Sequence, residues 1–172
     1  MNKTKHDITT SQTIGPFSHE AWKWATELGA DTMAGTITIS GIIYDGAGVP
    51  INDAQIESWQ PDAAQAESAL AIPGFRRVPS GENGEFELRL SAVPQAAGQP
   101  FAYITVFARG LVKHQFTAVF LEDDATLAKS AILEQVPAAR RPTLVATRSA
   151  AGQYNWNIHM QGKQETAFFD YV

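Results

Sequence analysis

Apolar and polar residues alternate over several stretches of the chain, a pattern typical of β-strands with one buried and one solvated face. The clearest case is the last one, where four apolar side chains alternate strictly with four polar ones. In an earlier stretch, Ile56 and Trp59 are the candidates for burial. Strands are predicted at 36–43, 54–60, 85–91, 143–148 and 154–161.

The most apolar stretch, 100–121, is predicted to form two strands joined by a turn at Arg109 and Gly110. Side chains alternate between the two faces of a strand, and in the first strand, 101–108, both faces are largely apolar. Such a strand usually lies in the middle of a core. We therefore expect this strand pair to be the centre of the fold.

Short runs of glycine, asparagine and aspartate separate the predicted strands and indicate turns. Two such turns fall at 45–48 and 151–152. The sequence Glu-Asn-Gly-Glu at 82–85 predicts a hairpin leading into the next strand.

Helical periodicity is limited to two segments. A short helix is predicted at 19–28, and a clearer one at 125–135 with Asp123 or Asp124 as its N-terminal cap. Residues 61–73 show no clear period and are predicted to be a loop. Roughly seven or eight strands with one convincing helix indicate an all-β fold, a β-sandwich with one short helix after the central strand pair.

The length of 172 residues is enough for one well-packed domain, which we place at 19–172. Residues 1–18 form an N-terminal arm whose Gly15-Pro16 imposes an extended or turn geometry just before Phe17. From these residues alone, a flexible tail and an arm packed on another surface both remain open.

Composition excludes several classes of function. The chain has no cysteine, so it forms neither disulfides nor thiolate metal sites. Its net charge of -5 argues against a nucleic-acid partner. No apolar run approaches the roughly 20 residues of a membrane span, and the first residues lack the apolar region of a secretory signal. We therefore expect a cytoplasmic protein that binds neither nucleic acid nor membrane.

The usual catalytic motifs are missing: there is no GxSxG, P-loop, GxGxxG or HExxH sequence. The four histidines, His6, His19, His114 and His159, are scattered, and no two share one face of one predicted element. Solvent-facing histidines are therefore the simpler interpretation, ahead of a metal site. From the residues alone, the chain is a β-sandwich of unknown function.

Six segments taken together, in order, add a resemblance to a known family. They cover nearly the whole chain and resemble the intradiol ring-cleaving dioxygenases, in particular the α chains of the two-chain protocatechuate 3,4-dioxygenases. The resemblance is weakest at 18–35 and 64–100, where this sequence looks shortened. The segments are SQTIGPF (11–17), GIIYDGAGVPINDAQIESWQPDA (41–63), VFARGL (106–111), VFLEDDATLAKSAIL (119–133), RRPTLVATR (140–148) and NIHMQGKQETAFFDY (157–171).

The resemblance implies a β-sandwich and an enzyme built from homologous α and β chains, with catalytic Fe(III) in the β chain. In such β chains two tyrosines and two histidines hold the iron, the histidines as His-x-His on one strand. The matching positions here are Phe101 and Tyr103. The resemblance therefore implies vestigial metal positions and no metal ligands or catalytic residues in this chain.

The resemblance also implies that the α chain's arm and its Phe-Ala-Arg-Gly turn line the β chain's active site. Matched residue by residue, the pocket and interface candidates are Thr13, Gly15, Pro16 and Arg109. Arg109 could pair with a carboxylate across the interface or steer a carboxylated substrate. Phe17 stands where the family commonly has tyrosine, so any hydrogen bond from that hydroxyl is lost.

The favoured interpretation is a non-catalytic α subunit that completes the active site of an iron-bearing β subunit. The complex would cleave protocatechuate with O2 to 3-carboxy-cis,cis-muconate, and another catechol, such as hydroxyquinol or a substituted protocatechuate, remains open as the substrate. The alternative is a free-standing β-sandwich binding or interaction module that has lost the enzyme. A self-sufficient metalloenzyme using the four histidines ranks last.

Overall fold

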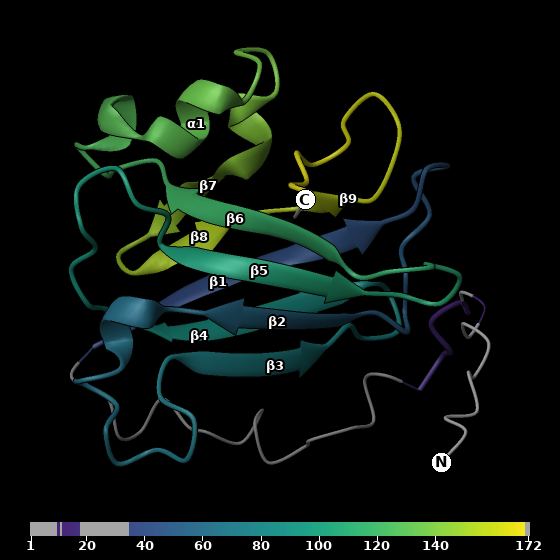
Figure 1. The fold of residues 1–172 in the computed structure, drawn as a ribbon, viewed down its shortest axis with the longest axis horizontal. Helices are drawn as coiled ribbons and strands as arrows, with labels where there is room; N and C mark the ends of the chain where they lie inside the picture. The colour runs from purple at the N-terminus through teal and green to yellow at the C-terminus, as the bar shows by residue number, and fades with distance from the viewer. Residues whose placement is uncertain (1–9, 11, 18–34, 171–172) are drawn as a thin grey trace, which may run out of the picture.

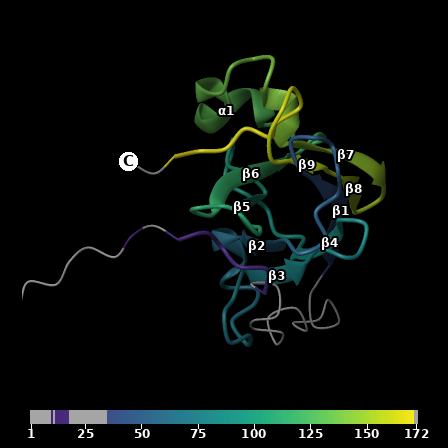
Figure 2. The same ribbon diagram turned by 90° about the vertical axis from the view of Figure 1, so that its right-hand side faces the viewer.

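The structure, a computed structural model, describes residues 10, 12–17 and 35–170 (Figure 1). Within these residues, eight strands follow the order β3-β2-β5-β6-β7-β8-β1-β4, and a ninth, β9, pairs with β1. Strands β6 and β7 pair in parallel over two residue pairs, and there the path folds into two facing layers (Figure 2). The predicted all-β sandwich is confirmed.

The strands have these bounds: β1 Thr36–Tyr44, β2 Gln55–Trp59, β3 Phe75–Pro79, β4 Glu85–Ser91, β5 Ala102–Phe107, β6 Gln115–Leu121, β7 Val145–Ala150, β8 Gln153–Asn155 and β9 Ile158–His159. The helical elements are the 3-10 turns η4 Pro61–Ala63, η5 Leu127–Lys129 and η6 Arg141–Leu144, and the α-helix α1 Ala131–Gln135. The helix predicted at 19–28 lies outside the described residues. No helix in the described part of the chain is long and apolar enough to cross a membrane.

The core lies between the two layers and contains apolar residues from both, among them Ile39, Leu88, Ile104 and Val119. A second cluster, on the outer face of β6, joins Ala118 and Phe120 to the segment that carries α1. Strand β6 is therefore buried on both faces.

Strand β5 lies between β2 and β6, as expected for the centre of its layer. Only one of its faces, carrying Ile104 and Val106, is fully buried, while Tyr103 and Phe107 on the other face are half-buried. Strand β5 is therefore central in its layer but does not lie in the middle of the core, because its outer face is only partly buried. Trp59 of β2 was a further candidate for burial, but it pairs in register with Tyr103 on the outer face and is 42% exposed.

The sequence 82–85 does form a turn, because Gly84 adopts a φ of 74° and Gly81 N–H donates to Glu85 O at 2.8 Å. The predicted hairpin is nevertheless wrong. Strand β3 pairs with β2 in one layer, and β4 pairs with β1 in the other. A local turn signal cannot distinguish a hairpin from a crossing between layers.

The C-terminal hairpin of β7 and β8 is confirmed, and Tyr154, Trp156 and Ile158 face the core as predicted. The predicted strand 154–161 is split into β8 and β9, both paired with β1. At the break, the carbonyl oxygen of Trp156 approaches Gly41 so closely that a Cβ at residue 41 would lie 1.8 Å from it. Only glycine therefore fits at this position of β1.

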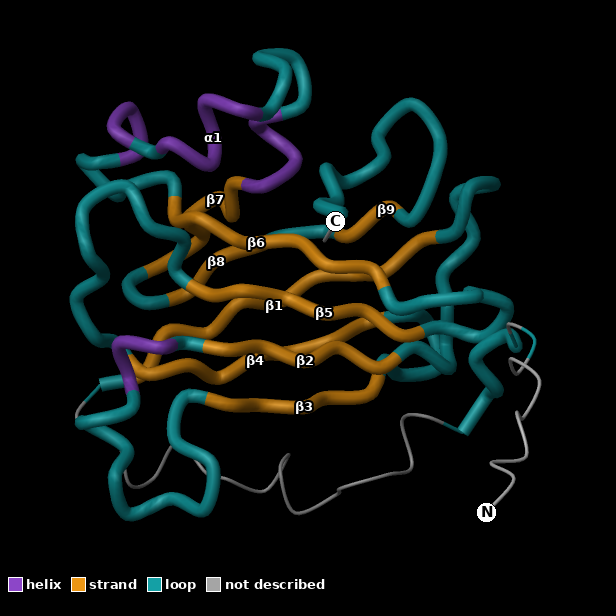
Figure 3. Tube along the Cα trace, viewed as in Figure 1, coloured by secondary structure: helices purple, strands orange, loops and turns teal. Residues whose placement is uncertain are grey.

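The helix predicted at 125–135 is broken at Ser130 into η5 and α1 (Figure 3). Ser130 has an extended backbone, and its Oγ accepts from Leu133 N–H at 3.2 Å as the N-cap of α1. Asp124 instead caps the preceding turn, because its Oδ1 accepts from Thr126 N–H at 2.7 Å. A serine side chain that competes for backbone donors explains the break.

A buried ion pair joins the edge strands β3 and β4 at one end of the sandwich. Glu67 and Arg76 are 3% and 4% exposed, and Arg76 Nη2 lies 2.6 Å from Glu67 Oε1. Glu67 also accepts from Ser91 Oγ and Gly74 N–H, both at 2.6 Å. Arg76 Nε donates to Arg89 O at 3.2 Å in β4. Side chains thus link two neighbouring strands that do not pair.

Stability should fall in acid because of Glu67. Burial alone would raise the pKa of Glu67, but hydrogen bonds from Arg76, Ser91 and Gly74 outweigh it and hold the pKa below 4.5. A carboxyl whose pKa is lower in the folded state stabilises the fold above its unfolded pKa, and this contribution is lost as pH falls through the folded pKa. Below about pH 4.5, we expect the urea concentration at the midpoint of unfolding to decrease as the pH falls. In Glu67→Gln this midpoint should depend less steeply on pH, and an equal dependence in the two proteins would contradict an origin in Glu67.

Candidate functional site

The N-terminal arm is docked on the β5–β6 turn by two backbone hydrogen bonds. Ile14 N–H donates to Leu111 O at 2.6 Å, and Gly110 N–H donates to Ile14 O at 3.2 Å. Gly110 has a φ of 90°, a conformation that favours glycine, and this aims its N–H at the arm. Thr13 and Gly15 flank the docked residue.

Arg109 precedes this glycine in the β5–β6 turn. The structure therefore brings Arg109 close to the predicted arm residues. Its Nε lies 3.1 Å from Oδ2 of Asp53, a residue of the turn before β2. The arginine side chain is 65% exposed, whereas that of Asp53 is 12% exposed. An ion pair this open to solvent contributes about 0–1 kcal/mol to stability.

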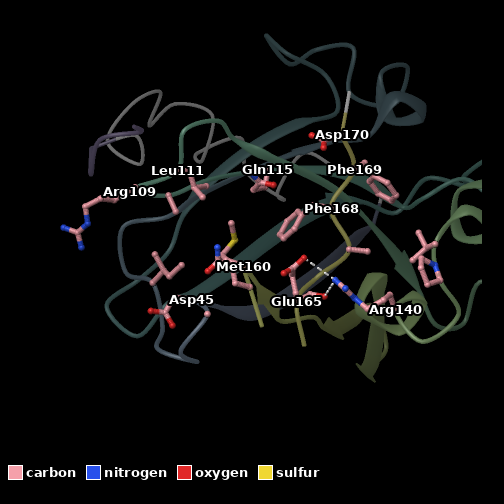
Figure 4. Close-up of a pocket in the computed structure, with 18 of the residues that line it drawn as sticks. Asp45, Arg109, Leu111, Gln115, Arg140, Met160, Glu165, Phe168, Phe169 and Asp170 are labelled. Carbon is pink, nitrogen blue, oxygen red and sulfur yellow. Dashed lines mark hydrogen bonds and ion pairs between the residues drawn. The ribbon is translucent and has the colours of Figure 1, made fainter. Parts of the chain in front are cut away.

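An open groove of about 890 Å³ begins at Arg109 and continues past the β5–β6 turn toward the C-terminal segment 160–170. Its centre is apolar, with Leu111, Met160 and Phe168, and Arg140 with Glu165 lies at the far end (Figure 4). The β1–β2 turn contributes Asp45, Gly46 and Ile51 to the wall.

At the far end, Arg140 Nη2 donates to the backbone oxygen of Glu165 at 2.6 Å and lies 3.5 Å from its Oε1. Sequence reasoning missed Asp53, Arg140 and Glu165 as site residues. Arg140 was visible as half of a basic doublet, Arg140-Arg141, but nothing in the sequence paired it with Glu165. Asp53 likewise had no visible partner.

Phe101 and Tyr103, the positions matched to the iron-binding histidines, lie in different clusters. Phe101 is 7% exposed and belongs to the core between the layers. Tyr103 packs in the outer cluster, stacks on Phe116 at 5.9 Å and donates its hydroxyl to Gln99 Oε1 at 3.1 Å.

Within the described residues, no three histidine, cysteine, aspartate or glutamate side chains lie close enough to share a metal ion. His114 lies against Phe107, while His159 stacks on Tyr44 at 4.9 Å. His6 and His19 lie outside the described residues.

Solved structures with a similar fold include several dioxygenases. The dioxygenase domain of a dioxygenase–carbohydrate-binding fusion protein from Streptomyces sp. SirexAA-E matches with a TM-score of 0.62 at 18% identity, covering 81% of this chain and 86% of that one. Catechol 1,2-dioxygenase from Acinetobacter sp. ADP1 matches with a TM-score of 0.55 at 16% identity, covering 76% of this chain and 54% of that one. The fold is that of the intradiol dioxygenases.

Sequence comparison narrows this class. The protocatechuate 3,4-dioxygenase alpha chain of Burkholderia cepacia is 35% identical over 78% of this chain and 76% of its own length. That of Pseudomonas putida is 32% identical over 95% of this chain and 96% of its own length. No family model matches the chain. The chain belongs to the family of protocatechuate 3,4-dioxygenase alpha chains.

Proposed function

We propose that this chain is the non-catalytic α subunit of a protocatechuate 3,4-dioxygenase-like enzyme. A homologous β subunit carries the Fe(III), and the complex cleaves protocatechuate with O2 to 3-carboxy-cis,cis-muconate in the cytoplasm. This chain completes the β subunit's pocket with Thr13, Gly15, Pro16 and Arg109. Residues 1–18 act as an arm that reaches the partner, and 19–172 form the sandwich domain.

The observation that carries this proposal is the docking of the arm on the β5–β6 turn, beside Arg109. The two backbone hydrogen bonds hold the arm and the arginine together at one end of the sandwich. Phe17 and Val112, from the arm and the turn, are 73% and 63% exposed. Large exposed apolar side chains suit a surface that a partner covers.

Purification of the chain alone and with a co-expressed β chain tests the proposal. We expect the single chain to be colourless, iron-free and inactive, and the complex to be red and to consume O2 with protocatechuate. Iron and ring cleavage in the chain alone would contradict the proposal. A stable chain that assembles with no β chain would instead favour a free-standing binding module.

A further inference from the structure

We propose that Asp53 is a positioning residue that orients Arg109 toward a carboxylate in the assembled pocket. This inference rests on the function proposed above, and it adds a residue that neither the motif pattern nor the family resemblance singled out. The carboxylate belongs either to the catechol substrate or to a side chain of the partner, and the experiment below distinguishes the two.

The first step concerns how rigidly Asp53 is held. Ser80 is 6% exposed and brackets the turn that carries Asp53: its Oγ donates to Ile51 O at 2.8 Å and accepts from Ala54 N–H at 3.0 Å. Ala54, the next residue, is fully buried. The carboxylate of Asp53 therefore projects from a turn with little freedom to move.

The second step concerns which part of Arg109 the carboxylate engages. The closest approach is an ion-pair contact to Nε, and no hydrogen bond from the Arg109 side chain is found within the described part of the chain. A guanidinium has five donors in a planar fork, and Nε carries one of them. A carboxylate beside Nε attracts that side of the guanidinium toward the Asp53 turn and leaves both terminal nitrogens for a bidentate contact.

The third step concerns why a carboxylate stands at this position. The side chain of Asp53 is only 12% exposed, and burying a charged group is unfavourable unless it is paired. Its ion-pair partner among the described residues is the largely exposed Arg109, a pair too open to stabilise the fold appreciably. A role in orienting the arginine explains the carboxylate better than a role in stability.

A double-mutant cycle tests the inference in the co-expressed α–β complex. The variants are D53N, R109A and the double variant, assayed by O2 consumption with protocatechuate and with catechol, which lacks the carboxylate. The control is E87Q, which breaks an exposed ion pair with Arg89 on β4, outside the groove. Melting curves check that each complex is folded.

We expect D53N to lower kcat/KM for protocatechuate by about 3- to 10-fold, and the double variant to be no worse than R109A, because Asp53 acts through Arg109. E87Q should match the wild type. A loss confined to protocatechuate assigns the carboxylate to the substrate, and an equal loss with catechol assigns it to the partner; both support the positioning role.

Wild-type kinetics in D53N would overturn the inference, as would losses for D53N and R109A that multiply; either result leaves the proposed function standing. If D53N does not assemble, D53S repeats the test, and failure of both makes Asp53 a structural residue and overturns the inference. A wild-type mixture without iron or activity would instead refute the proposed function, and the inference with it.

Discussion

Replacing Glu67 with alanine is expected to lower the free energy of unfolding by about 3–5 kcal/mol, the usual cost of removing one partner of a buried ion pair. The guanidinium of Arg76, which is 4% exposed in the intact protein, would lose this counter-charge, and Ser91 Oγ and Gly74 N–H would lose their acceptor. Unsatisfied buried donors each add to the loss. Urea unfolding of the full chain measures the effect.

The matched control is Glu87→Ala. Glu87 also pairs with an arginine, Arg89 at 2.7 Å, but the two side chains are 49% and 61% exposed. Its loss should cost less than about 1 kcal/mol. Similar losses in Glu67→Ala and Glu87→Ala would mean that the buried pair contributes no more to stability than an exposed one.

Local patterns in the sequence predicted the strands well where one face is buried and the other is exposed to solvent. The alternation at 154–161 placed Tyr154, Trp156 and Ile158 in the core, because side-chain direction depends only on the strand itself. The same alternation shows why the placement of Trp59 was wrong. Trp59 lies three residues from Ile56, so the two side chains must point to opposite faces. The break at Ser130 could not be predicted, since helical periodicity does not register a capping serine.

Features that depend on distant segments escaped prediction. The turn at 82–85 was recognised, but which strands pair is decided between layers. Glu67 lay in a stretch predicted to be a loop, and only the fold brings Arg76 and Ser91 to it. In the candidate site, Arg109 and the arm were found through the family resemblance. Asp53 was not, because its partner is far along the chain.

Replacing Arg109 with alanine in the α–β complex is expected to lower kcat/KM for protocatechuate by about 10- to 100-fold. This range corresponds to a hydrogen-bonded charged contact of about 1.5–3 kcal/mol. The chain itself should remain folded, because Arg109 is 65% exposed and its ion pair with Asp53 contributes little stability. Steady-state O2 consumption with protocatechuate, alongside co-purification with the β chain, provides the measurement.

Arg89→Ala is the matched control, since Arg89 is 61% exposed, is also paired with a carboxylate, and lies on β4 outside the groove. It changes the net charge equally, so a general electrostatic effect on a carboxylated substrate would appear in both variants. A loss specific to Arg109→Ala requires a local contact at the end of β5. Unchanged kinetics and assembly would remove Arg109 from the site, leaving the docked arm as this chain's contribution to the pocket.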